Sequence, residues 1–280
     1  MQTYGDLEVI VVDDSSADSS LEILHSYGDR IRLIVNNPNV GTYPALNRAL
    51  EAATGEYVAV LNSDDLWKPE KLDRQVALLE SDPDMAFCHT YGWFIDENDV
   101  EIAGAPMGFV FPRTESGKIL HTFVANNSAI ASSVVMRTSY AKKVGGFDGS
   151  FRNLGDWDMW LRLAEAGNVG FVDEKLTLYR VHGANTIYAT ETTRREEQLI
   201  RERHRERAQE LLVSASDESA MKRSLAHSLA CLGSLYSIAG NPTEARACFK
   251  QSLKLNPRRV KSALRYLLTF APLPIRRRLL

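Results

Sequence analysis

Short apolar runs alternate with helix-like segments through the first half of the chain. The apolar runs cover residues 7–12, 31–35, 56–61 and 85–91, and segments of helical pattern such as 45–53 and 69–81 lie between them. Apolar runs without polar alternation suit strands that are buried on both faces. Strands separated by helices of about ten residues indicate βαβ units. This half of the chain therefore predicts an α/β fold with a mainly parallel sheet.

The pattern is less regular after residue 92. Between 92 and 130 Gly, Pro and Asn recur, and we expect a long excursion with one short helix at 116–124. A strand at 129–137, a helix at 156–166 and two short strands at 168–172 and 176–181 follow.

Composition narrows the class of protein. Apolar residues make up 44% and charged residues 25% of the 280 positions, as in ordinary globular proteins. No apolar run approaches the roughly 18 residues that span a bilayer, and the polar N-terminus does not resemble a signal peptide. The three cysteines are scattered without a paired motif, which predicts reduced thiols in a cytoplasmic protein.

The last third of the chain differs in charge and pattern. Residues 1–190 hold 15 basic and 27 acidic side chains, a net charge of −12, whereas residues 191–280 hold 18 basic and 9 acidic, a net charge of +9. The stretch 221–257 fits the spacing of a tetratricopeptide repeat (TPR), a helix–turn–helix unit. The matching positions are Leu232, Gly233, Tyr236, Gly240, Ala245, Phe249 and Pro257. We therefore expect an α/β domain over 1–189 and an all-α region with one TPR-like helix pair over 190–280.

Two acidic pairs follow predicted strands. Asp13 and Asp14 come after the first run, and Asp64 and Asp65 come after the third. Ligands of open α/β sheets bind beyond the carboxyl ends of the strands, so both pairs are expected at the ligand-binding edge. Paired carboxylates suit Mg²⁺ or Mn²⁺ bound together with substrate phosphates. The alternative is that each Asp only caps the helix that follows it.

Two further residues are candidates for chemistry. Asp156 begins a predicted helix, where capping is the simpler interpretation. His182 lies in a late loop, where an imidazole suits Mn²⁺, although a single loop histidine is more often structural.

Five stretches together resemble the family 2 glycosyltransferases, which are inverting enzymes of the GT-A fold. The stretches are QTYGDLEVIVVDDSSAD, NVGTYPALNRALEAATGEYVAVLNSDDLWKP, SSVVMRTSYAKKVGGFDGSF, LGDWDMWLRLAEAG and LYRVHGANT. They span roughly residues 2–187 in the order and spacing of the family.

The resemblance implies a role for each candidate. Asp14 would contact the base of a nucleotide-sugar, with Asp13 supporting the turn. Asp64 would hold Mn²⁺ or Mg²⁺ within a DxD-like motif, together with His182, and Asp156 would be the catalytic base. The remaining nucleotide-sugar contacts implied are Gly41, Asn47, Asn62, Ser63 and Asp65. Asn62 departs from the family pattern, which has an Asp at that place.

The resemblance also implies a reaction and its setting. Asp156 would take the proton of an acceptor hydroxyl as its oxygen attacks the anomeric carbon, which predicts inversion. The expected donor is a UDP-sugar, and the acceptor a saccharide or a lipid-linked sugar in cell-surface polysaccharide or glycolipid assembly. The family normally begins with a further strand and helix of roughly 25–30 residues before the Gln2-Thr3 seen here, so the N-terminal domain is expected to be incomplete.

Alternatives and partners follow from the rest of the chain. A non-catalytic remnant that binds proteins, or self-associates, through the TPR-like region is the second hypothesis. A nucleotidyltransferase is disfavoured because no Gly-rich basic triphosphate loop is visible.

Residues 258–280 hold seven basic and no acidic residues among apolar ones, which suits either an anionic membrane surface or a helix that caps the repeat. No nucleic-acid-binding module accompanies them. We therefore expect a cytoplasmic protein, with possible peripheral contact at the inner face of the membrane.

Overall fold

The computed structural model of the protein describes residues 2–104, 110–183, 185 and 190–279. Residues 105–109 of the predicted excursion, and residues 186–189 before the predicted domain border, lie outside these ranges. The chain divides into two compact units, the first made of residues 1–119 and 128–189 and the second of residues 120–127 and 190–280. The predicted helix near 120 therefore belongs to the second unit, although it was expected within the α/β domain.

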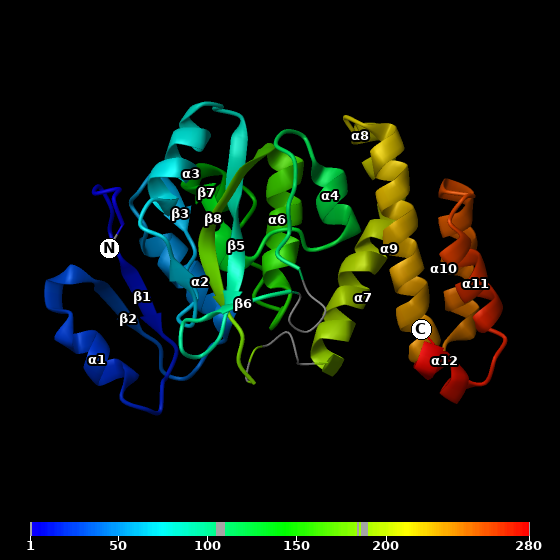
Figure 1. Ribbon diagram of the computed structural model, residues 1–280, viewed down its shortest axis with the longest axis horizontal. Helices are drawn as coiled ribbons and strands as arrows, with labels where there is room; N and C mark the ends of the chain where they lie inside the picture. The colour runs from blue at the N-terminus through cyan, green and yellow to red at the C-terminus, as the bar shows by residue number, and fades with distance from the viewer. Residues whose placement is uncertain (1, 105–109, 184, 186–189, 280) are drawn as a thin grey trace. The chain divides into compact units, whose positions relative to one another are not determined.

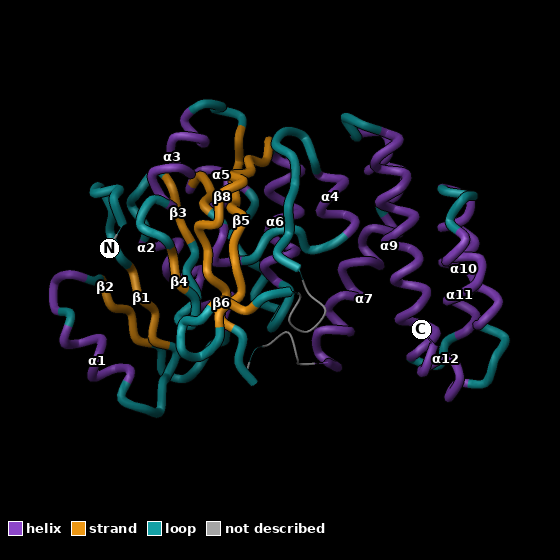
Figure 2. The backbone as a smooth tube through the Cα atoms, in the orientation of Figure 1, coloured by secondary structure: helices purple, strands orange, loops and turns teal. Residues whose placement is uncertain are grey.

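The first unit contains both sheets and the helices that cover them (Figures 1 and 2). Its strands are β1 (Ile10–Asp13), β2 (Arg32–Val35), β3 (Tyr57–Ala59), β4 (Leu66–Trp67), β5 (Met85–Ile95), β6 (Glu101–Ile102), β7 (Val135–Arg137) and β8 (Asn168–Arg180). Its helices are α1 (Ser20–Ser26), α2 (Thr42–Ala52), α3 (Lys71–Glu80), α5 (Thr138–Lys143) and α6 (Gly155–Ala166).

The larger sheet is mixed, whereas a mainly parallel sheet was expected. Its order is β3-β7-β5-β8-β4, and β6 pairs with β5. Among the described residues β5 pairs with β8 in parallel, and the other neighbours in this sheet run antiparallel. The two late strands predicted at 168–172 and 176–181 form one continuous strand, β8. Its pairing with β5 shifts register around Tyr91, and the irregularity accommodates the polar residues Asp173 and Glu174 within the strand.

The carboxyl ends of β3, β5 and β8 share one edge of the larger sheet. β7 is antiparallel to both β3 and β5, and β5 is parallel to β8, so these three strands run in the same direction. The loops after them begin at Val60, Asp96 and Val181. Ligands of α/β sheets bind at this edge, so these loops are where a site is expected.

Helices cover both faces of this sheet. Phe87 and Cys88 are neighbours on β5, so their side chains point to opposite faces. The Phe87 ring stacks on Trp160 of α6 with centroids 5.6 Å apart, whereas Cys88 clusters with Leu72 and Leu79 of α3. The core of the unit therefore lies between α3, the sheet and α6.

β1 and β2 form a separate parallel sheet of two strands. Ile10, Val11 and Val12 of β1 are only half-buried, although their apolar run predicted a strand buried on both faces. The described residues show no backbone ladder between this pair and the larger sheet. The expectation of a further strand stays a prediction.

The second unit is helical. It consists of α4 (Leu120–Ala125), α7 (Thr190–Glu206), α8 (Ala208–Ser214), α9 (Glu218–Ile238), α10 (Pro242–Leu255), α11 (Val260–Leu268) and α12 (Leu273–Leu279). Asp217 caps α9 by accepting the N–H of Ala220, and Asn241 caps α10 by accepting the N–H of Glu244, as short polar side chains do at helix starts. No described helix has the length and apolar character needed to cross a membrane.

α9 and α10 form the helix pair expected from the TPR-like pattern. They approach closely at Gly233, where an added Cβ would lie 2.9 Å from the ring of Phe249. Phe249, Ala230 and Ala245 form the buried core between the two helices. The spacing of small and large residues therefore has a packing reason, while the assignment to the repeat family stays a prediction.

Candidate active site

Asp14 ties the end of β1 to the loop before α2. Its carboxylate accepts the side-chain N–H of Asn36 at 2.8 Å and the backbone N–H groups of Val40 and Gly41 at 2.9 and 2.8 Å. Burial alone raises the pKa of Asp14, but these hydrogen bonds and the charge of Arg48 together hold the pKa below its usual value. The group is therefore a carboxylate at neutral pH, and it fixes the loop in place.

Asp13 is buried directly beside it, with 4% of its surface exposed. Its carboxylate accepts the backbone N–H of Ser16 at 3.3 Å, across a turn in which Ser15 has φ of 68°. Asp13 thus supports the turn, in line with the role that the resemblance gave it.

Gly41 and Asn47 position α2. Gly41 has φ of 94°, a backbone conformation that favours glycine, and its carbonyl accepts the N–H of Ala45 in the first turn of the helix. Asn47 exchanges two hydrogen bonds with the backbone of Phe147, at 2.7 and 2.8 Å. Asn47 therefore joins α2 to the loop before α6, and its predicted contact with a nucleotide-sugar stays a prediction.

Residues 62–65 form a tight turn after β3. Asp65 donates its backbone N–H to the carbonyl of Asn62 at 3.2 Å, and Asn62 donates its own N–H to Ser132 Oγ at 3.0 Å. Ser63 is exposed on this turn. Asp65 anchors the turn to the rest of the unit. Its carboxylate accepts Ser132 Oγ–H at 2.5 Å and the backbone N–H of Arg180 at 2.9 Å.

Asp65 is part of the wall of the site. It is 4% exposed, and burial raises its pKa to about 6. The charge of Asp64 also raises this pKa, whereas the hydrogen bonds from Ser132 and Arg180 lower it. Its oxygens are engaged by the protein itself, so its structural role is to join the turn to β8.

Asp64 and His182 meet although 118 residues separate them. His182 Nε2 lies 3.0 Å from Asp64 Oδ2, and their side chains are 32% and 36% exposed. The Arg180 guanidinium donates to the Asp64 carbonyl at 2.8 Å, and His182 donates its backbone N–H to Asn185 Oδ1 at 2.6 Å. One carboxylate oxygen and one imidazole nitrogen, both reachable from solvent, are donors that suit Mn²⁺. No group of three or more His, Cys, Asp or Glu among the described residues is arranged to hold a metal.

Asp156 is the second residue of α6. The N-cap position belongs to Leu154, so the capping interpretation of Asp156 was wrong. Asp156 Oδ1 accepts the N–H of Trp157 at 2.7 Å, and a negative side chain in the first turn is favoured by the helix dipole. The side chain is half-buried. α6 packs on β5 and β8 and ends directly before β8 begins, so its start faces the edge where β8 ends.

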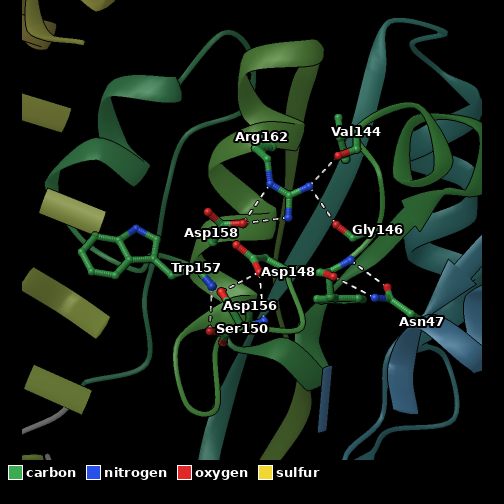
Figure 3. A network of polar contacts seen from close by, with 10 residues as sticks. Asn47, Val144, Gly146, Asp148, Ser150, Asp156, Trp157, Asp158 and Arg162 are labelled. Carbon is green, nitrogen blue, oxygen red and sulfur yellow. Dashed lines mark hydrogen bonds and ion pairs between the residues drawn. The ribbon is translucent and has the colours of Figure 1, made fainter. Parts of the chain in front are cut away.

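An arginine clamp fixes the start of α6 (Figure 3). Arg162 contacts the buried carboxylate of Asp158 through Nε and Nη2 at 2.9 and 2.7 Å. Its Nη1 donates to the carbonyls of Val144 and Gly146 at 2.7 and 2.8 Å. Nearby, Ser150 donates to Asp148 from both its N–H and its hydroxyl. The loop before α6 is thus fastened to the helix that carries Asp156.

Contacts connect the Asp14 loop with the start of α6. Tyr43, two residues after Gly41, packs so closely on Gly155 that a Cβ there would lie 2.7 Å from the ring. Since Asp156 follows Gly155, the first turns of α2 and α6 lie side by side. The structure therefore brings Asp156 near the Asp14 loop and places Asp64 and His182 together at the edge of the larger sheet.

Three residues that build the site were not predicted from the sequence. Ser132 donates to Asp65, Arg180 donates to the carbonyl of Asp64, and Arg162 fastens the start of α6. Only Arg162 carried a local signal, because it lies four residues after Asp158 on the same helix face. Ser132 and Arg180 act on residues 67 and 115 positions away, which no local pattern reveals.

Comparisons with known proteins identify the class. The sequence profile of "Glycosyl transferase family 2" matches residues 1–144, more than half of the chain. The chain therefore belongs to glycosyl transferase family 2, which confirms the resemblance seen in the sequence.

Two curated relatives show how far the likeness extends. An uncharacterized glycosyltransferase of Rickettsia typhi is 31% identical over 195 residues, covering 66% of this chain and 58% of the relative. The Escherichia coli protein WfaP, a "UDP-Glc:alpha-D-GlcNAc-diphosphoundecaprenol beta-1,3-glucosyltransferase", is 32% identical over 192 residues, covering 66% of this chain and 69% of WfaP. The chain spans 58% of the length of the first of these relatives.

A solved structure confirms the fold. Staphylococcus aureus TarS, residues 1–349 in complex with UDP, superposes with a TM-score of 0.63 at 19% identity. The match covers 99% of this chain and 82% of that one. The GT-A fold with a helical C-terminal region, expected from the sequence, is thus confirmed.

Proposed function

We propose that the protein is an inverting glycosyltransferase that moves a sugar from a nucleotide-sugar to a hydroxyl acceptor. The observation that carries the proposal is the meeting of Asp64 and His182 beyond the carboxyl ends of β3 and β8. Family membership and the exposure of both side chains support it. We infer that the donor is a UDP-sugar, because TarS binds UDP and WfaP is named for UDP-glucose.

The donor would be held by the two turns that follow β1 and β3. Asp14 and its loop, with Gly41, Asn62 and Ser63, would contact the nucleotide. Asp64 and His182 would hold Mn²⁺ or Mg²⁺, since a carboxylate and an imidazole suit such cations when substrate phosphates complete the ligand set. When bound, the cation supplies Lewis-acid stabilisation of the diphosphate leaving group.

The acceptor would be activated by Asp156. Its carboxylate would take the proton of the acceptor hydroxyl while that oxygen attacks the anomeric carbon, opposite the departing diphosphate. Attack on the face opposite the leaving group inverts the configuration at that carbon. The Arg162 clamp would keep the start of α6, and with it Asp156, in place.

The acceptor class and setting belong to the same proposal. WfaP is named for a lipid-linked acceptor, a GlcNAc-diphosphoundecaprenol. We infer a saccharide or lipid-linked acceptor and a role in cell-surface polysaccharide or glycolipid assembly, at the cytoplasmic side of the membrane. In this scheme residues 1–189, apart from the α4 segment 120–127, would form the catalytic domain, and 190–280 would form an accessory helical region together with α4.

Replacement of Asp156 by Asn tests the base. We expect a loss of transfer of at least about 100-fold, because general-base catalysis contributes about 10²–10⁴. The increase in melting temperature caused by UDP with Mn²⁺ should persist, because Asp156 does not hold the nucleotide. The control is Asp173→Asn, an exposed carboxylate paired with Arg113, which should transfer normally.

Two outcomes would count against the proposal. Transfer at the normal rate by Asp156→Asn would refute the role of the base. A wild-type chain that neither hydrolyses UDP-sugars nor is stabilised by UDP with Mn²⁺ would favour a non-catalytic role for the α9–α10 helix pair in binding protein.

A further inference from the structure

α11 carries a row of apolar side chains that is exposed to solvent, whereas Ser262 and Tyr266 face the rest of the helical unit. Ser262 is fully buried, and its hydroxyl lies 3.0 Å from that of Ser252 on α10. Val260, Leu264 and Leu267, spaced four and three residues apart, are 68%, 57% and 63% exposed. That spacing places them on one face of the helix. A surface helix normally buries its row of apolar side chains against its own protein. The exposed row on α11 therefore suits contact with another molecule.

The apolar surface continues into the turn after α11. Phe270 is 63% exposed, and its ring packs edge-on against Tyr266 with centroids 5.7 Å apart. The Arg246 guanidinium lies 4.8 Å above the same ring. An exposed aromatic ring held by two neighbours is a built feature of the surface. We define Val260, Leu264, Leu267 and Phe270 as the α11 apolar face.

Positive charge is concentrated in the segment of the chain that carries this face. Residues 245–280 contain ten basic side chains and no acidic one, because Glu244 is the last acidic residue of the chain. Arg258 and Lys261 are exposed next to the first turn of α11, and Arg277 and Arg278 are exposed on α12. Lys261 and Arg265 lie four residues apart along one flank of the helix, where long basic side chains can reach past apolar neighbours toward anionic groups.

Charge and apolarity together point to one kind of partner. A second copy of the chain in a symmetric contact would bring the same basic side chains face to face, which is unfavourable. A nucleic acid would use the basic residues but would leave Leu264, Leu267 and Phe270 in water. An anionic lipid bilayer satisfies both, because apolar side chains enter the boundary between headgroups and acyl chains while Lys and Arg contact the phosphates.

We propose that the α11 apolar face, with the basic residues of the same segment, docks on an anionic membrane surface. The contact uses none of the candidate catalytic residues and so stands independently of the proposed reaction. It would hold the protein at the membrane by insertion of a helix face.

Vesicle co-sedimentation of the full-length chain tests the proposal. We expect binding to phosphatidylcholine vesicles that contain phosphatidylglycerol, weak binding to phosphatidylcholine alone, and a decline at high salt. The double variant Leu264→Gln/Leu267→Gln should lower the partition coefficient by at least about tenfold. The double variant Arg258→Gln/Lys261→Gln should weaken binding to anionic vesicles and reduce its salt dependence.

The matched control replaces an equally exposed apolar residue elsewhere in the same unit. Val213 on α8 is 78% exposed, so Val213→Gln should bind vesicles as the wild type does. Unchanged melting temperatures would show that all variants fold. The proposal is overturned if wild-type protein does not bind anionic vesicles, or if the leucine variant binds as well as the control. It is also overturned if the leucine variant instead converts a wild-type oligomer into a monomer without changing vesicle binding.

Discussion

Lys71 is a charged residue in the core of the first unit. Its side chain is fully buried, its Nζ has no hydrogen-bond partner among the described residues, and it lies 4.0 Å from the centre of the Trp67 ring. Burial lowers the pKa of Lys71 to about 7. A buried amine without a hydrogen-bond partner costs stability, and no step of the proposed reaction uses it.

Replacing Lys71 by Met should therefore stabilise the protein. We expect the free energy of unfolding at pH 7 to rise by about 1–3 kcal/mol, because Met fills a similar volume without a polar atom. Urea unfolding measures the change. Lys68→Met, at an exposed position, is the control and should shift stability by less than about 0.5 kcal/mol.

The same residue predicts how stability depends on pH. The unfolded chain keeps a proton on Lys71 up to about pH 10, whereas the folded chain releases it near pH 7. Between these values the unfolded state binds more protons, so this group makes the protein more stable as the pH rises from 7 toward 10. Urea unfolding from pH 7 to pH 9.5 should show a shallower rise in Lys71→Met than in the wild type. Equal slopes would contradict the assignment.

If Asp64 and His182 bind the cation, replacing either residue should change how transfer depends on Mn²⁺. Asp64→Asn or His182→Ala should raise the Mn²⁺ concentration needed for half-maximal transfer by at least about tenfold, because each removes one of the two protein ligands. Titration of transfer with Mn²⁺ measures this, and the exposed His25→Ala should behave as the wild type. Identical Mn²⁺ curves in all variants would argue against a metal at this pair.

At the scale of elements, the Arg162 clamp couples α6 to the loop before it. Arg162→Met should lower the free energy of unfolding by about 2–3 kcal/mol, because it leaves the Asp158 carboxylate, 7% exposed, without its ionic partner. The double variant Asp158→Asn/Arg162→Met should recover part of that loss. Since Asp156 lies on the same helix, kcat should fall more than UDP affinity changes. A loss of stability with unchanged kcat would show that the clamp does not position Asp156.

Some elements and site residues could be predicted from the sequence, and others could not. The positions of Asp14, Asp64 and His182 shortly after strands could be predicted, because each lies within three residues of an apolar run, whereas Asp13 is the last residue of β1 itself. The mixed sheet was not predicted, since strand direction depends on pairing across the chain. The merging of two predicted strands into β8 was missed because its middle, Asp173-Glu174-Lys175, is polar and exposed. The contacts of Ser132 and Arg180 depend on the completed fold.

At the scale of the whole molecule, the helical unit depends on a segment from the first half of the chain. Phe123 and Val124 of α4 are fully buried, and α4 belongs to the same unit as α9. A fragment ending at residue 189 should therefore expose these side chains, aggregate, and melt at a lower temperature than the full chain. Size-exclusion chromatography and thermal melting measure this. A monomeric fragment 1–189 with an unchanged melting temperature would contradict it.

That segment also limits how such a chain can exchange parts by recombination. The chain passes between its two units at residues 119/120, 127/128 and 189/190. A tail gained by simple fusion would need one passage. Swapping everything after 189 for the tail of a homologue would pair α4 with helices that did not evolve with it, so a working chimera must carry residues 120–127 along with the new tail. The helical unit is thus encoded by two separate stretches of the sequence, residues 120–127 and 190–280.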